Sequence, residues 1–294
     1  MTDRPAITIL LATANRADVL GEAIESVLGQ SHKDFELLVL DCRSEDDTES
    51  VVRSVSDPRV RYLYSDRADR AGVCAEGLSH SRGDFVAFMD VQARWHRDFL
   101  AELHQALSGA PESMGVAYAP AELHTDEKDG AERIPAGEAP EGDLRRTLFS
   151  GPLVAPASML IRAKPLKTLS QNRHRFWLTD DYTLSLWLAC QTRFKALAES
   201  RVTVRTSAGQ GVRGLDPVSE ARGKALLRCL HDMPGKVPGR FGRQCLAGYY
   251  GDCADQALAQ GRSSEAFGNA LQGLLYTPFS IRAWRRLVRI SVSG

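Results

Sequence analysis

The sequence predicts an α/β fold in which helices cover both faces of a mostly parallel central sheet. A short, continuous apolar run lies at residues 6–12 and a second run typical of a buried strand at 35–41, and two more strand candidates lie at 59–65 and 84–90. Between these runs the apolar residues return at helical spacing, first at Leu20, Ala23, Ile24, Val27 and Leu28. Strands that alternate with helices in this way form parallel sheets with both faces buried.

Each strand run is followed by its own helix. AITILLA precedes the helix around 20–28, and FELLVLD precedes a helix that carries Val51, Val52 and Val55. Ser44, followed by Asp47, is predicted to cap this second helix, because a side-chain oxygen there accepts a bond from an unpaired backbone N–H. RVRYLYS precedes a short helical stretch that ends at Gly83, and DFVAFMD precedes a helix over 98–107.

The following segment returns to strands after an insertion. Residues 121–143 are polar with Gly and Pro, which is typical of a hairpin or loop. Strand character returns at 151–163 and again within 194–207. Between these strands, TDDYTLSLWLAC opens with two carboxylates and continues as an apolar helix.

The pattern predicts two domains, an α/β domain over 1–215 and a helical extension over 216–294. A linker is expected at about 231–244, where HDMPGKVPGRFGRQ is dense in Pro, Gly and basic residues. Beyond it the chain reads as helix, turn, helix, turn, helix, with breaks at Gly261 and Pro278.

Composition excludes several classes of protein. The chain has 294 residues, of which 43% are hydrophobic and 25% charged, and 37 basic residues balance 37 acidic ones, so no nucleic-acid partner is expected. No apolar run reaches the ~18–20 residues of a membrane span, and the polar residues that follow the first short apolar run lead us to expect no secretory signal. The six cysteines show no C-x-x-C spacing, which favours reduced thiols and a cytoplasmic protein. Peripheral contact at the inner face of the membrane is a further expectation.

Polar residues follow three of the predicted strands. They lie at Thr13–Arg16, Asp41–Ser44 and Asp90–Gln92. Ligands bind beyond the carboxyl ends of strands in open parallel sheets, so these segments are the first candidates for a site.

The motifs themselves resemble a known family. ITILLATANRADVLGEAIESVLGQSHKDFELLVLDCRSEDDT is similar to the start of family 2 glycosyltransferases, with its P-T-Y-N-R, S-[VI]-L-x-Q and V-D-D-G-S-x-D motifs. RGDFVAFMDVQARWHRDFL, GPLVAPASMLIRAKPL and LTDDYTLSLWLAC follow in the family's order. The resemblance covers roughly residues 5–210 and implies the GT-A fold, with a Rossmann-like sheet and a small C-terminal helical region.

The resemblance also implies a chemistry. These enzymes transfer a sugar from a nucleotide-diphosphate sugar to an acceptor hydroxyl with inversion, which requires a general base for the hydroxyl proton. A UDP-sugar donor and a glycan or lipid-linked acceptor are expected, in surface polysaccharide or other glycoconjugate biosynthesis. A divalent metal, Mn²⁺ or Mg²⁺, on a D-x-D motif usually stabilises the departing diphosphate. The sequence lacks the Q-x-x-R-W motif and the membrane spans of processive enzymes.

The first two motifs imply a nucleotide pocket. Thr13, Asn15 and Arg16 match T-x-N-R, but the same residues also suit a polar turn in which Asn15 or Asp18 caps the helix. Asp41 matches the first Asp of V-D-D-G-S, where it would bind the base or ribose, or else cap the next turn. Ser44 keeps its match in that motif.

The segment that begins at Gly72 is expected to line the same pocket. It is three residues shorter than the family's and lacks the family's Arg–Asn pair. Arg70 and Arg82 flank the segment, and spacing assigns a phosphate contact to neither.

The later motifs imply the catalytic groups. Asp90 matches the first carboxylate of D-x-D and is the expected metal ligand, while the neutral Gln92 stands where the second carboxylate belongs, which makes the metal doubtful. Asp180 and Asp181 match the family's E-D pair, and Asp181 is the expected base. Acids also favour a helix N-terminus for electrostatic reasons alone, worth about 0.3–1 kcal/mol.

Two interpretations remain open from sequence. The departures from the family pattern, at Ala14, Cys42, the Gly72 segment and Val91–Gln92, also suit a catalytically impaired binding or scaffold module. Likewise, Arg282, Arg285, Arg286 and Arg289 could form, with Trp284, Leu287, Val288 and Ile290, a basic amphipathic face for an anionic membrane, or the solvated face of a packed hairpin.

Overall fold

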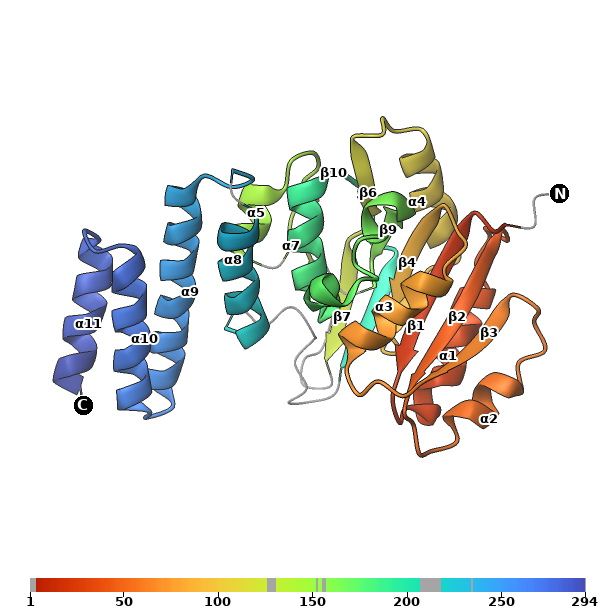
Figure 1. The fold of residues 1–294 in the computed structure, drawn as a ribbon, viewed down its shortest axis with the longest axis horizontal. Helices are drawn as coiled ribbons and strands as arrows, with labels where there is room; N and C mark the ends of the chain where they lie inside the picture. Colours follow the sequence, from red (N-terminus) through yellow and green to blue (C-terminus); the bar gives the residue numbers. More distant parts are fainter. Residues whose placement is uncertain are drawn as a thin grey trace. The chain divides into compact units, whose positions relative to one another are not determined.

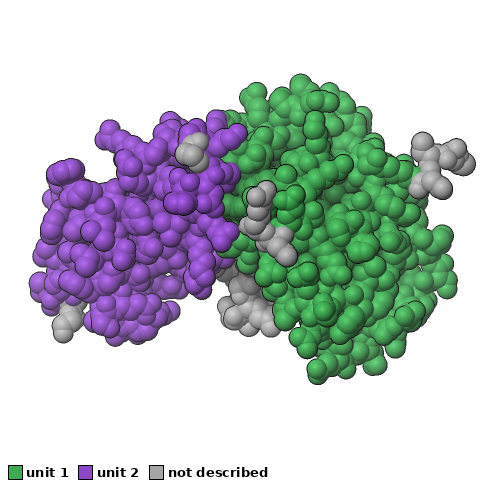
Figure 2. Space-filling view, viewed as in Figure 1, with its two compact units in different colours: residues 1–144, 153–215 green, residues 145–152, 216–294 purple. Residues whose placement is uncertain are grey.

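The computed structural model describes residues 4–125, 131–151, 153–154, 157–206, 218–233 and 235–293. The chain divides into two compact units, one of residues 1–144 and 153–215 and the other of residues 145–152 and 216–294 (Figure 2). The sequence placed 145–152 in the first domain. These residues group with the second unit because helix α5 (Arg145–Ser150) packs on α9 (Gly239–Ala259), with the rings of Phe149 and Phe241 6.4 Å apart.

The first unit is built on a seven-stranded, mostly parallel sheet, as predicted (Figure 1). Its strand order is β10-β6-β9-β4-β1-β2-β3, and β1, β2, β3 and β4 run parallel to their neighbours in that group. Only β9 runs antiparallel, between β4 and β6. The strands are β1 (Ile7–Thr13), β2 (Phe35–Cys42), β3 (Val60–Ser65), β4 (Phe85–Met89), β6 (Met114–Tyr118), β9 (Met159–Arg162) and β10 (Arg193–Ala196).

A four-stranded sheet of order β5-β11-β7-β8 adjoins it. β7 pairs antiparallel with β8, from Ala121↔Ile134 to His124↔Ala131, so the polar insertion begins with a hairpin. The tip of the hairpin at 126–130 lies outside the described residues. The strands are β5 (Ala93–Trp95), β7 (Ala121–Thr125), β8 (Ala131–Ile134) and β11 (Val202–Thr206).

Helices bury both faces of the main sheet because successive side chains of a strand point to opposite sides. Ile7, Ile9 and Leu11 of β1 share one apolar cluster with α1 (Ala17–Leu28) and α4 (Phe99–Ser108). On the other face, Leu10 and Leu40 lie so close to Gly77 of α3 (Arg70–His80) that a Cβ at Gly77 would clash with them. The continuous apolar runs in the sequence reflect this two-sided burial.

Three further helices complete the first unit. α2 (Thr48–Arg53) follows β2, and α6 (Ala163–Leu166) leads into a 3₁₀ segment, η1 (Asn172–Leu178). α7 (Asp181–Gln191) follows directly, and its residues Asp181 to Cys190 are all buried. Packing along almost the whole length of α7 therefore holds the N-terminus of this helix in place.

The second unit is helical. α8 (Glu220–Asp232), α9, α10 (Ser263–Tyr276) and α11 (Ile281–Ser293) follow one another with short connections. No helix within the described ranges is long and apolar enough to cross a membrane.

The linker expected at 231–244 is wrong for most of its length. α8 runs to Asp232 and α9 already begins at Gly239. Gly242 allows α8 and α9 to pack closely, because Leu230 of α8 lies directly over it, where a Cβ would clash.

Candidate functional site

The strand ends that carry the predicted motifs meet at one edge of the sheet. Thr13 at the end of β1 is the register partner of Asp41 on β2. On the other side of β1, Leu11 pairs with Met89, and Asp90 follows directly. The edge is therefore lined by the ends of β1, β2 and β4, the place where open sheets of this kind bind ligands.

Asp41 is buried at this edge with both carboxylate oxygens engaged. Oδ1 accepts a bond from the backbone N–H of Ser44 at 2.8 Å, and Oδ2 accepts one from the hydroxyl of Tyr62 at 2.6 Å. Burial and this bond to Asp41 raise the pKa of Tyr62. Asp41 therefore fixes its own loop and the neighbouring strand, which agrees with the turn-capping interpretation and leaves only its remaining lone pairs for a ligand.

Ser44 does not cap α2, contrary to the prediction. The helix begins at Thr48, and the backbone N–H and hydroxyl of Thr48 donate to Asp46. Ser44 Oγ instead accepts a bond from the backbone N–H of Asn15, at 2.9 Å. The prediction failed because Asp46, closer to the helix, accepts the bonds from Thr48, while Ser44 bonds to the loop that contains Asn15.

Asn15 and Asp46 complete this connection between the two loops. Asn15 has a left-handed backbone, with φ 51°, and its Oδ1 accepts a bond from the N–H of Glu45 at 2.8 Å. The N–H of Ala17, in the first turn of α1, donates to Asp46 Oδ2 at 3.0 Å. Neither Asn15 nor Asp18 caps α1 through its side chain, and Asp46 takes that place from the other loop. The bonds from Thr48 and Ala17 lower the pKa of Asp46.

Arg16 and Gly72 flank this pair of loops. The side chain of Arg16 is partly exposed and approaches Asp18 at 3.4 Å. Gly72 lies in the first turn of α3, where its N–H donates to the capping residue Asp69 at 2.9 Å. A Cβ at Gly72 would lie 2.7 Å from Cδ of Arg67, so the glycine allows Arg67 to pack against the start of α3.

A second group of residues lies at the starts of α3 and α7. Arg70 opens α3, and its Nη1 donates to the carbonyl of Leu178 at 3.0 Å. Its Nη2 lies 3.7 Å from Oδ2 of Asp181, the first residue of α7. Both side chains are buried, with 16% of Arg70 and 3% of Asp181 exposed.

Asp180 holds the helix start next to Asp181. It is the N-cap of α7, and its Oδ1 accepts the N–H of Thr183 at 2.7 Å in a capping box. This contact gives Asp180 a structural role and fixes the backbone from which Asp181 projects.

The predicted acids act together on Arg70. Burial alone would lower the pKa of Arg70, but the negative charge of Asp181, followed by contributions from Cys74, Asp90 and Asp180, outweighs it and raises that pKa. The charges of acids from two distant motifs thus act on one guanidinium. The sequence singled out Arg70 but assigned no contact to it. The signal that could have placed Arg70 at the start of a helix is the preceding Asp69, because Asp is a residue type that favours a helix start.

The residues at Asp90 do not fit a resident divalent cation. Asp90 Oδ1 accepts the backbone N–H of Gln92 at 2.9 Å, and Gln92 contributes no charge. Among the described residues, no group of three or more His, Cys, Asp or Glu side chains is placed to hold a metal. The positive charge of Arg70 already interacts with Asp90, and it would repel a second cation at that position.

Comparisons with known proteins identify the fold. The structure resembles that of S. aureus TarS 1-349 in complex with UDP-GlcNAc, with a TM-score of 0.64 and 14% identity over 98% of this chain and 87% of that one. It also resembles the mannosyltransferase PcManGT from Pyrobaculum calidifontis in complex with GDP-Man and Mn²⁺, with a TM-score of 0.55 and 19% identity over 99% and 86% of the two chains. The fold is the GT-A fold.

The sequence relationship is more specific. The model of the family "Glycosyl transferase family 2" matches residues 8–169, more than half of the 294-residue chain, and the chain belongs to this family. The GalNAc(5)-diNAcBac-PP-undecaprenol beta-1,3-glucosyltransferase of Campylobacter jejuni is 36% identical over 90 residues, which cover 29% of each chain. The succinoglycan biosynthesis protein ExoO of Rhizobium meliloti is 32% identical over 113 residues, or 38% of this chain and 32% of that one. The chain thus spans less than a third of the length of both curated relatives.

Proposed function

We propose that the protein is an inverting, non-processive glycosyltransferase that moves a sugar from a nucleotide-diphosphate sugar to an acceptor hydroxyl. The observation that carries the proposal is the position of Asp181, a buried carboxylate fixed at the start of α7 and facing Arg70 together with Asp90. Membership of family 2 supports the reaction, and the relatives that act in polysaccharide assembly support surface polysaccharide or glycoconjugate biosynthesis.

In the proposed reaction the acceptor oxygen attacks the anomeric carbon from the face opposite the diphosphate. The new C–O bond forms as the bond to the diphosphate breaks, and the departing nucleoside diphosphate keeps the electron pair. The Asp181 carboxylate takes the hydroxyl proton. The capping box at Asp180 keeps this carboxylate in place during the transfer.

The donor is proposed to be a UDP-sugar. Its nucleoside would lie against the loops after β1 and β2, with Thr13, Asn15, Arg16, Asp41 and Ser44, and its diphosphate would lie near Gly72, Asp90 and Gln92. The solved relatives support a nucleotide-sugar but differ in base, since one is bound to UDP-GlcNAc and another to GDP-Man. A glycan or lipid-linked acceptor is proposed by analogy with the Campylobacter enzyme, whose name describes such an acceptor.

The test combines transfer with binding. Asp181→Asn is expected to lower kcat about 10²–10⁴-fold, the contribution of a general base, while calorimetry shows UDP affinity no weaker than that of the wild type. Glu220→Gln, which changes an exposed acid in the first turn of α8, is the matched control and should leave both unchanged. Full transfer by a folded Asp181→Asn protein would reject the base, and failure of the wild type to bind any nucleotide-sugar would favour the scaffold alternative.

We also propose that the second unit contacts an anionic membrane through α11. Leu287 and Ile290 pack inward against Ala254, Ala257, Ala266 and Ala270, which corrects their expected place on the outer face. The outer side chains Ile281, Trp284, Val288 and Val292 are 51–83% exposed. Since a helix turns about 100° per residue, these residues form one apolar stripe roughly 80° wide.

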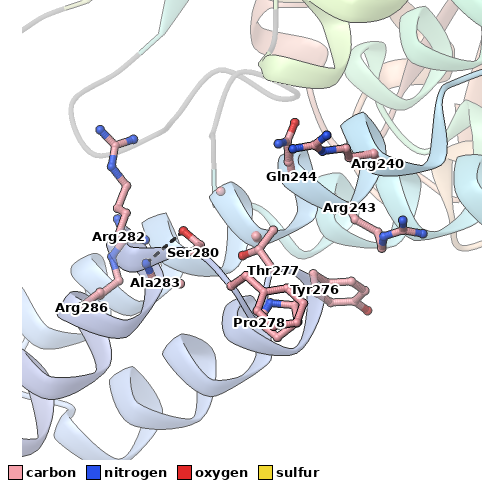
Figure 3. A pocket seen from close by; sticks show the side chains of 13 residues that line it. Arg240, Arg243, Gln244, Tyr276, Thr277, Pro278, Ser280, Arg282, Ala283 and Arg286 are labelled. Carbon is pink, nitrogen blue, oxygen red and sulfur yellow. Dashed lines mark hydrogen bonds between the residues drawn. The ribbon is translucent and has the colours of Figure 1, made fainter.

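Charge supports a membrane as the occupant of this surface. α11 contains four arginines and no acid. Arg286 and Arg289 pair with Asp255, whereas Arg282 and Arg285 have no ion pair within the described part of the chain. Beside the stripe, Arg240, Arg243, Arg282 and Arg286 line a groove of about 810 Å³ at the turn that carries the almost fully exposed Phe279 (Figure 3). A symmetric contact between two copies would bring arginines together, so anionic lipid is the better partner.

Vesicle sedimentation tests this contact. The protein is expected to bind vesicles that contain phosphatidylglycerol but not vesicles of phosphatidylcholine alone, with a blue shift of Trp284 fluorescence. Val288→Asp and Arg285→Glu should each abolish binding, and Lys224→Glu on α8 is the control for a change of charge. Absence of binding to either vesicle, or a stable dimer by light scattering that Val288→Asp dissociates, would overturn the proposal.

A further inference from the structure

Arg70 holds a positive charge at the starts of α3 and α7, 3.7 Å from the proposed base Asp181. Its side chain is 16% exposed, and the carbonyl of Leu178 orients its guanidinium. The negative charges of Asp181 and of Asp90, the acid of the degenerate D-x-D motif, also raise the pKa of Arg70. A guanidinium is always charged, and its planar fork matches the oxygens of a diphosphate.

The contact between Arg70 and Asp181 leaves room for exchange. At 3.7 Å it is longer than the ~2.7–2.9 Å of a charge-assisted hydrogen bond. Arg70 therefore balances the charge of Asp181 without a close bidentate bond to it. An incoming diphosphate, with more negative charge than one carboxylate, would compete for the same guanidinium.

We propose that Arg70 replaces the divalent metal in this chain, so that donor binding and transfer proceed without a metal ion. This inference rests on the proposed function. In the free protein Arg70 neutralises Asp181. When the donor binds, Arg70 pairs with the diphosphate oxygens, and the Asp181 carboxylate becomes available to the acceptor hydroxyl. The guanidinium of Arg70 then stabilises the negative charge that develops on the leaving nucleoside diphosphate. Because no metal ion has to be bound, the degenerate Asp90–Gln92 motif needs no second acid.

Nucleotide affinity measured by calorimetry tests this role directly. For the wild type, the affinity for UDP is expected to agree within about twofold in the presence of EDTA and of Mn²⁺, and Mn²⁺ alone should show no binding. Arg70→Gln should weaken UDP binding about 10–100-fold, as the loss of one or two charge-assisted bonds requires. Arg262→Gln, which changes an exposed arginine of the second unit, is the matched control and should leave UDP affinity unchanged.

A second variant reverses the proposed replacement. In Arg70→Gln combined with Gln92→Asp, Mn²⁺ should restore UDP binding at least tenfold, because the second acid returns and the repelling charge is gone. Arg70→Lys, which keeps the charge but loses the fork, should lie between the wild type and Arg70→Gln. Circular dichroism shows whether each variant folds, and the wild-type comparison with and without Mn²⁺ needs no variant at all.

The outcomes separate this inference from the proposed function. Wild-type binding that Mn²⁺ strengthens tenfold or more would overturn the role of Arg70 and leave the glycosyltransferase assignment intact. The same holds if a folded Arg70→Gln protein binds UDP as well as the wild type. If the wild type binds neither UDP nor GDP under any condition, the proposed function falls and this inference falls with it.

Discussion

The two halves of the strand-end site are held together in different ways. At the ends of β1 and β2, the two loops are joined and fixed by hydrogen bonds between groups of the chain itself. These bonds involve Asn15, Asp41, Ser44 and Asp46. At the starts of α3 and α7, hydrogen bonds fix Asp180 and Arg70, but Arg70 and Asp181 approach each other only to 3.7 Å. Short bonds close the first half, whereas the long contact in the second half would allow one anion to replace another, as the proposed release of a diphosphate requires.

The largest expected change in the free energy of unfolding tests whether Arg70 and Asp181 compensate each other's charge. Asp181→Asn leaves Arg70 buried with less compensation and should lower the free energy of unfolding by about 3 kcal/mol, the usual result of breaking a buried ion pair. The double variant with Arg70→Gln should recover most of that loss in urea unfolding. Strictly additive losses would show that the two side chains do not compensate each other.

Asp41→Ala should show the opposite behaviour in the other half. It removes two accepted bonds and leaves the buried hydroxyl of Tyr62 and the N–H of Ser44 without their acceptor, at a cost of about 2 kcal/mol. Adding Tyr62→Phe should recover only part of this loss, because the N–H of Ser44 stays unsatisfied. Full recovery in the double variant would remove the contrast between the halves.

A smaller effect is expected at Asn15, where conformation and bonding can be separated. Asn15→Ala should destabilise by about 1–2 kcal/mol, because it loses the bond from Glu45 and strains a left-handed backbone. Asn15→Gly relieves the strain and should cost less. Thermal unfolding of both variants measures the difference, and equal losses would assign the whole effect to the hydrogen bond.

The smallest effect is expected from Glu36 on β2, which serves as a reference away from the site. Burial raises the pKa of Glu36, but bonds from Arg82, Thr8 and Arg61 outweigh it and hold the pKa below its usual 4.5. The folded chain therefore binds this proton less readily than the unfolded chain. The contribution of Glu36 to stability is present above about pH 4.5 and is lost as the pH falls through the folded pKa.

Urea unfolding of Glu36→Gln across this pH range checks the assignment. The difference from the wild type should be constant at neutral pH and should shrink below pH 4.5. A difference that grows on acidification would contradict the lowered pKa.

The sequence predicted the sheet well because its signals are local. The runs around Leu10, Leu38 and Ala87 are mostly apolar, since helices cover both faces of those strands. The motifs likewise marked the acids at 41, 90, 180 and 181. Their roles were harder to predict, because the partner that decides each role lies far away in the chain.

Asp46 and Arg70 illustrate this limit. Asp46 takes the N–H of Ala17, 29 residues earlier, and Arg70 contacts Leu178, 108 residues later. Neither distance leaves a periodic signal in the sequence. Gly242 contributed to the wrong linker prediction for a similar reason, because a glycine that allows two helices to approach cannot be distinguished by composition from a glycine in a linker.

The capping box of α7 has one further consequence. Asp180 and Asp181 are adjacent, yet one secures the backbone while the other presents its carboxylate to Arg70. The position of the proposed base relative to its substrate therefore depends on the folding of α7, a helix whose other residues are buried in the protein interior. Fraying of that first turn would impair sugar transfer even if every reacting group were still present.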